Sequence, residues 1–115
     1  MFTVQQGEVR IKRIESLPDG METKDVEKAK SGRFIISHSE KGHHHTLDGD
    51  CVVMERTNNV PAGMRQLYAI LENPGELIQE AANAHEKQEL PAGIYRLDIS
   101  REYDPFMEQA RMVAD

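Results

Sequence analysis

The chain has 115 residues, of which 38% are hydrophobic and 30% charged, without low-complexity tracts. This composition predicts one globular domain over residues 1–115 and excludes a disordered chain. The net charge of −6, and the lack of a basic stripe with interleaved aromatic residues, argue against nucleic acid as a partner, because phosphate backbones repel an acidic surface.

The single cysteine, Cys51, cannot form an intramolecular disulfide, and the sequence shows neither a secretory signal pattern nor about 18 successive apolar residues. We therefore expect a cytoplasmic protein without a membrane partner. Cys51 follows Asp48-Gly49-Asp50 and leads into Val52-Val53-Met54, which is typical of a strand that enters the core. We interpret its thiol as buried and inert rather than nucleophilic.

Short segments bounded by turn residues follow one another along the first half of the chain. Residues 4–17 alternate imperfectly between apolar and polar and predict a strand, which Pro18-Asp19-Gly20 ends as a turn. Residues 21–31 are polar, and their periodicity allows either a short surface helix or a loop. Residues 34–36 form an apolar run that suits a buried strand.

The second half carries two similar phrases, Val-Pro-Ala-Gly-Met at residues 60–64 and Leu-Pro-Ala-Gly-Ile at residues 90–94. Each predicts a tight reversal that leads into a strand, because proline presets φ and glycine accepts positive φ. The composition of residues 76–87 favours a helix by propensity, and an extended segment is the alternative. The succession of short strands and turns predicts an all-β barrel or sandwich with at most one short helix.

The most distinctive segment is the histidine cluster at residues 43–45. Strand residues i and i+2 project from the same face, so His43 and His45 would converge while His44 points the other way. Paired imidazoles suit Zn, Fe, Ni or Mn, and further ligands usually come from another strand. Candidates with an oxygen or imidazole donor are Glu40 and His85, followed by His38 and Gln79. The alternative interpretation is that the three histidines form an exposed polar turn.

A second group of polar residues follows the expected last strand. Within Arg101-Glu102-Tyr103-Asp104-Pro105, Tyr103 is a candidate hydrogen-bonding group for a ligand at the mouth of a barrel. Arginine among carboxylates is more typical of a surface ion pair. The sequence contains no Gly-rich phosphate loop, G-x-S-x-G elbow, C-x-x-C pair or H-E-x-x-H helix, so it does not assign a reaction.

Several motifs together resemble a family of small uncharacterised bacterial and phage proteins. The family carries a Q-G-D-V start, an S-E-x-T-G-H-x-H segment, and L-P-x-G-x-Y followed by R-E-Y-D-P. The matching segments are Gln6-Gly7-Glu8-Val9, residues 39–45, residues 90–95 and residues 101–105. The resemblance spans most of the chain and implies a cupin-like barrel in which His43 and His45 line the interior, with residues 76–87 extended.

The chain departs from related patterns at two places. The family has an H-E-E-H stretch before L-P-x-G; His85 matches its last histidine, but Ala82 replaces its first. The full cupin signature is not satisfied either, because Asp48 and Asp50 follow His45 where a glutamate is required. The first departure removes one possible metal ligand, and the second argues against a cupin enzyme.

Three functions are compatible with these features. The first is a small metal-binding β-barrel with His43, His45 and His85 as ligands, and with Glu40 as a fourth ligand or as a partner that orients an imidazole. The second is a non-enzymatic binding or assembly module, associated with a phage or mobile element, that acts as a homo-oligomer. The third is a metal-free pocket for a small-molecule ligand, with the histidines as hydrogen-bonding groups.

Overall fold

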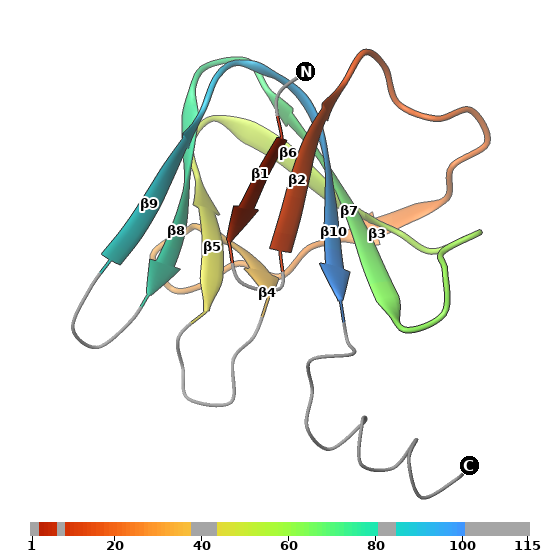
Figure 1. Ribbon diagram of the computed structural model, residues 1–115, viewed down its shortest axis with the longest axis horizontal. Helices are drawn as coiled ribbons and strands as arrows, with labels where there is room; N and C mark the ends of the chain where they lie inside the picture. The colour runs from red at the N-terminus through yellow and green to blue at the C-terminus, as the bar shows by residue number, and fades with distance from the viewer. Residues whose placement is uncertain (1–2, 7–8, 38–43, 81–84, 101–115) are drawn as a thin grey trace, which may run out of the picture.

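The computed structural model describes residues 3–6, 9–37, 44–80 and 85–100, and it places them in two antiparallel β-sheets (Figure 1). For residues 4–6, 79, 80, 85 and 86 only the backbone is described. The described part contains no helix, and therefore no helix long and apolar enough to cross a membrane.

Ten strands make up the two sheets. The six-stranded sheet has the order β1 (Thr3–Gln6), β2 (Val9–Ile14), β10 (Gly93–Ser100), β7 (Met64–Leu71), β6 (Cys51–Arg56) and β3 (Thr23–Asp25). The four-stranded sheet has the order β4 (Phe34–Ser37), β5 (His45–Asp48), β8 (Gly75–Glu80) and β9 (His85–Leu90). The last strand, β10, therefore lies between β2 and β7 in the middle of the larger sheet.

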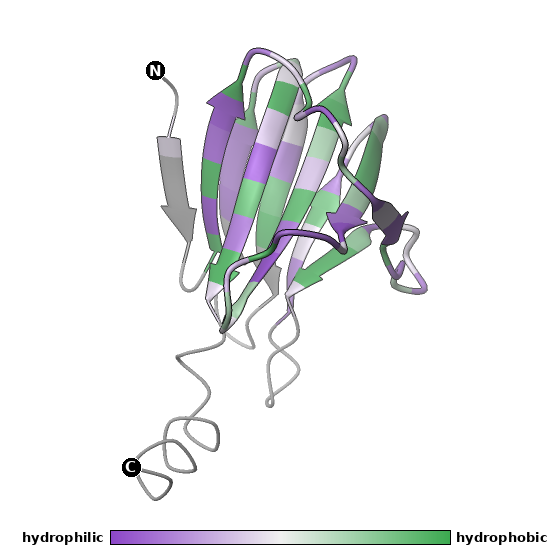
Figure 2. Cartoon of the chain, turned by 90° about the vertical axis from the view of Figure 1, so that its right-hand side faces the viewer, coloured by the Kyte–Doolittle hydropathy of each residue, from purple (hydrophilic) through white to green (hydrophobic). Residues whose placement is uncertain are grey.

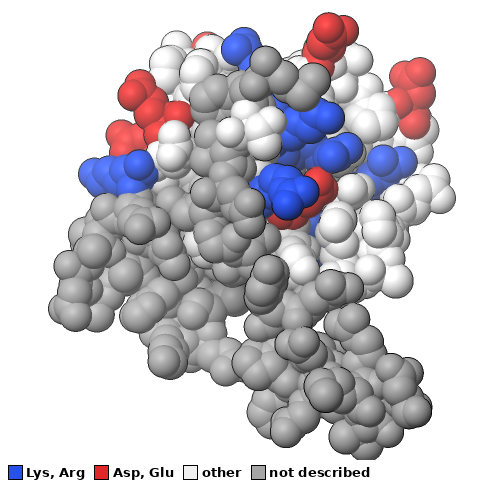
Figure 3. All heavy atoms as spheres, viewed as in Figure 1, with Lys and Arg blue, Asp and Glu red and all other residues white. Residues whose placement is uncertain are grey.

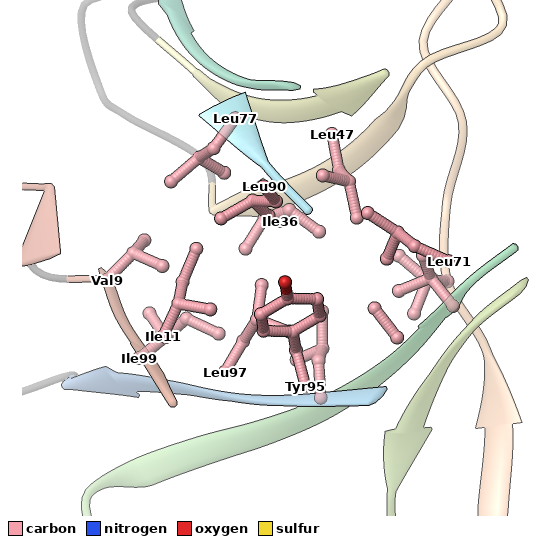
Figure 4. Packing of buried hydrophobic residues seen from close by; sticks show 14 residues of the cluster. Val9, Ile11, Ile36, Leu47, Leu71, Leu77, Leu90, Tyr95, Leu97 and Ile99 are labelled. Carbon is pink, nitrogen blue, oxygen red and sulfur yellow. The ribbon is translucent and has the colours of Figure 1, made fainter. Parts of the chain in front are cut away.

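The core lies between the two sheets and follows the alternation of apolar and polar residues along the strands (Figure 2). Tyr95 and Leu97 of β10 are fully buried and point toward Leu47, Leu77 and Leu90 of the smaller sheet (Figure 4). Burial of each such side chain contributes about 1.5–3 kcal/mol to folding. Alternation of this kind places an apolar side chain at the core-facing positions of these strands.

These observations confirm the all-β prediction, but the described strands do not close into one barrel. The sheets are open, with β1 and β3 at the edges of one and β4 and β9 at the edges of the other. The extended alternative for residues 76–87 is confirmed where the structure describes them, in β8 and β9, and the helix interpretation is wrong there. Leu77 and Ile78 are both buried, so tertiary burial outweighs helix propensity.

Two other segments differ from the expected elements. Residues 4–17 do not form one strand, because β1 and β2 pair with each other as antiparallel neighbours. Residues 21–31 contain the short strand β3 and a bridge from Lys28 to Phe34 instead of a helix. Local periodicity could not distinguish these outcomes, because β2 also pairs with β10 and β3 pairs with β6, both of which are distant in the chain.

Both Pro-Ala-Gly phrases lead into strands, as predicted. Gly63 has a φ of 77° directly before β7, and Gly93 has a φ of 156° as the first residue of β10. In the second phrase the hydroxyl of the buried Tyr95 donates a hydrogen bond to the carbonyl of Pro91. The pKa of Tyr95 is raised by burial, and the charge of Arg13 opposes this increase.

The turn between β5 and β6 packs closely against the start of β8. A Cβ atom on Gly75 would lie 2.8 Å from the carbonyl oxygen of Asp48 and 3.0 Å from Cδ2 of Leu71. Real Cβ atoms essentially never show a contact below 3.0 Å, so a side chain at this position would force β8 or the end of β5 to shift.

A charged group links the two sheets. Nη2 of Arg65 on β7 lies 2.7 Å from Oε1 of Glu55 on β6, and Nη1 of Arg65 donates a 3.4 Å hydrogen bond to the carbonyl of Ile36 on β4. Lys24 on β3 adds a longer contact, 3.9 Å from its Nζ to Oε2 of Glu55. The side chains of Glu55 and Arg65 are only 13% and 22% exposed, so solvent screens their pairing less than that of a surface ion pair.

Candidate functional site

The sheet topology brings the strand ends next to the predicted site residues to one end of the molecule. At this end β4 stops at Ser37, β5 starts at His45, β8 stops at Glu80 and β9 starts at His85 (Figure 1). The last strand, β10, also stops there, at Ser100. We call this region the histidine end and define it by these five strand termini.

His45 is the best-defined residue of the histidine end. Its side chain is only 2% exposed, and strand alternation places it on the same face as Leu47, which belongs to the core. The neighbouring Thr46 points to the opposite face, where its Oγ1 donates a 3.4 Å hydrogen bond to the carbonyl of Ile78. The imidazole of His45, a group that can bind a metal ion, thus lies at the border of an apolar core. The adjacent His44 is half-buried.

Two neighbours share the row of His45 across the smaller sheet. Its Cα pairs with Ser37 on β4 and with Gln79 on β8. Ser37 is 4% exposed and was not identified from the sequence, although a serine that directly follows a buried apolar run is the signal that could have found it. Gln79 was one of the less favoured ligand candidates, and the register places its backbone opposite His45.

The remaining predicted residues are placed less closely or lie outside the described residues. His85 is the first residue of β9; its Cα pairs with Glu80, and β8 separates its strand from that of His45. Glu40, His43 and Tyr103, together with His38, lie outside the described residues. Among the side chains that are described, no group of three His, Cys, Asp or Glu residues could hold a metal ion.

Cys51 has the environment of a structural thiol. It is partly buried at the start of β6, and its Sγ lies 3.5 Å from the carbonyl oxygen of Gly49. Burial raises the pKa of the Cys51 thiol, and the negative charges of Asp48 and Asp50 raise it further. A thiol that stays protonated is a poor nucleophile, in agreement with the inert thiol inferred from the sequence.

Comparison with known proteins identifies one family. Neither curated proteins nor solved structures give a significant match to the chain. A family model does match, over residues 5–100, a range that includes the histidine cluster and both Pro-Ala-Gly phrases. That agrees with the expectation of a small uncharacterised family. The chain therefore belongs to the family described as a domain of unknown function (DUF8820).

Proposed function

We propose that the histidine end binds a divalent transition-metal ion, with the imidazole of His45 as the innermost ligand. The observation that carries this proposal is the burial of His45 at the first position of β5, at the border of the core. Imidazole nitrogen is a common ligand for Zn, Fe, Ni and Mn. A mostly apolar environment favours the bond between such an ion and an imidazole nitrogen, because fewer water molecules compete for the ion.

The other ligands would come from chain segments that meet this end. His43 and Glu40 belong to the connection between β4 and β5, and His85 starts β9. In the proposed site His43 and His85 are the second and third ligands, and Glu40 is a fourth ligand or orients an imidazole. An ion with an open coordination position would supply Lewis-acid chemistry to a small-molecule ligand, which Tyr103 would help to bind.

Isothermal titration of tag-free, chelator-treated protein with ZnCl2 and NiCl2 tests this proposal. We expect one ion per chain, and an affinity at least about tenfold lower in His45→Gln, since loss of one ligand removes a metal bond. His44→Gln is the matched control, because it changes the adjacent histidine of the same cluster and should leave the affinity close to that of the unchanged protein.

A buried histidine that only supports the fold would behave differently. In that case the unchanged protein would bind no ion with defined stoichiometry, and His45→Gln would lower the melting temperature equally with and without metal. Equal metal binding by His45→Gln and the unchanged protein would also contradict the proposal, because the ion would then lie elsewhere.

A further inference from the structure

The solvent-facing side of the six-stranded sheet carries a continuous apolar row. The row crosses four adjacent strands. Ile94 on β10 pairs with Ile14 on β2 and, on its other side, with Ile70 on β7. Ile70 also pairs with Val52 on β6. These residues alternate with the core positions of their strands, so they point away from the core. Val52 is 57% exposed and is the only large hydrophobic residue in the described chain with an exposed side chain.

A basic corner lies on one side of this row, two to four residues along β2 and two residues along β10. It consists of Arg10, Lys12 and Arg96, and Figure 3 shows basic side chains gathered on one face of the molecule. Arg96 contacts Asp98 at 3.2 Å, which leaves the corner with a net positive charge. Lys12 lies directly opposite Arg96 on the neighbouring strand, and the repulsion between these like charges destabilises the sheet of a single chain.

An acidic corner lies on the other side of the row, at the diagonally opposite position. Asp50 precedes Val52 by two residues, and Glu72 follows Ile70 by two residues. Both are exposed. Lys12, Arg96, Asp50 and Glu72 are each two residues, about 7 Å, from the apolar row along their chain segments, and Arg10 lies two residues further along β2.

We propose that this face is the interface of a two-fold homodimer. An axis that lies in the face, perpendicular to the line between the two corners, brings the centres of the two apolar rows together, so that the rows cross each other. The same rotation places the basic corner of each copy over the acidic corner of the other. The face is thus complementary to itself, as an isologous interface requires. The strands of the two copies cross steeply, which is one of the established ways for sheets to pack.

The chemistry of the face favours a second copy over other occupants. Association removes from water the exposed side chain of Val52 and the accessible parts of the half-buried Ile14, Ile70 and Ile94. Carboxylates of the partner copy also offset the repulsion between Lys12 and Arg96. The patch covers only part of four strands, so the dimer forms in a concentration-dependent equilibrium rather than as an obligate unit.

A charge-swap experiment by sedimentation velocity tests the dimer. The unchanged protein should show a sedimentation coefficient that rises with concentration. Arg10→Glu combined with Lys12→Glu makes both corners acidic, and Asp50→Lys combined with Glu72→Lys makes both corners basic, so each double variant should remain monomeric. An equimolar mixture of the two variants should dimerise again, because each acidic corner then meets a basic one. Lys30→Glu, an exposed substitution on a loop, is the control and should leave the equilibrium unchanged.

A second variant separates loss of association from loss of folding. Val52→Ser should weaken dimerisation at least about tenfold while the far-ultraviolet circular dichroism spectrum stays unchanged, since the side chain is exposed in the monomer. A strictly monomeric unchanged protein would overturn the proposal. Dimers that persist in both double variants, or a mixture that stays monomeric, would overturn it equally. None of these residues is one of the proposed metal ligands, so the test of the dimer does not depend on metal binding.

Discussion

The close approach at Gly75 predicts a measurable loss of stability when a single methyl group is added. In Gly75→Ala the new Cβ would lie 2.8 Å from the carbonyl oxygen of Asp48, a backbone atom that cannot rotate away as the end of a flexible side chain could. Gly75 does not have a positive φ, so alanine is compatible with its backbone conformation and the effect is steric.

The expected size follows from two opposing contributions. Overpacking of this kind costs about 1–3 kcal/mol. Replacing glycine by alanine restricts the unfolded chain, which returns about 0.4–1 kcal/mol. We expect a net loss of about 1–2 kcal/mol. Unfolding entropies of about 2.1 cal/mol/K per residue give about 0.24 kcal/mol/K for 115 residues, so the melting temperature should fall by about 4–8 °C.

Equilibrium unfolding in urea, followed by circular dichroism and supported by calorimetry, measures this loss. Glu76→Ala is the matched control, because it changes the next, exposed residue of β8 and should shift the free energy of unfolding by less than about 0.5 kcal/mol. An unchanged or higher melting temperature in Gly75→Ala would show that β5 and β8 do not approach each other as closely as described, and the steric explanation would be wrong.

Three further predictions concern the other contacts. Arg65→Met should lower the free energy of unfolding by about 1.5–3 kcal/mol in urea, because it removes the charged link to Glu55 and the hydrogen bond to Ile36. A loss below about 0.5 kcal/mol would contradict this. Tyr95→Phe should lower the free energy of unfolding by about 0.5–1.5 kcal/mol in the same assay, because it removes the hydrogen bond to the carbonyl of Pro91. An unchanged free energy of unfolding would show that this hydrogen bond does not stabilise the fold. Cys51 and Tyr95 have raised pKa values in the folded chain, so the folded chain keeps protons that the unfolded chain releases at alkaline pH. The free energy of unfolding should therefore fall as the pH rises above the ordinary pKa of cysteine, 9.0, and then that of tyrosine, 10.0. The double variant Tyr95→Phe with Cys51→Ala should show a smaller decline in thermal melts from about pH 8 to 11.

Turn chemistry and alternation were sufficient to predict most strands. The Pro-Ala-Gly phrases, and the apolar run before Ser37, depend on local backbone preferences that are visible in the sequence. The break between β1 and β2 and the strands within residues 76–87 were not decided by local pattern, since β2 also pairs with β10 and β8 also pairs with β5, which are distant in the chain.

The candidate site was predictable only in part, for a similar reason. The i, i+2 spacing of the histidines singled out His45, and the structure places it inside the fold. The sequence could not reveal that Ser37 and Gln79 lie opposite it, because the pairing of β4, β5 and β8 is set by core packing and by the contact at Gly75. Such cross-strand neighbours are the residues that a search by motif misses.

The central position of β10 has a consequence for how the chain folds. Ile94 pairs with Ile14, so the larger sheet joins residues that are far apart in sequence, and folds rich in such contacts form slowly. The hairpins β6–β7 and β8–β9 can form early, since each closes a short loop. During synthesis, however, β2 and β7 have no common neighbour until residues 93–100 have left the ribosome. The edges of both strands remain open until then, so a nascent chain that stalls before β10 would be the species most prone to aggregate.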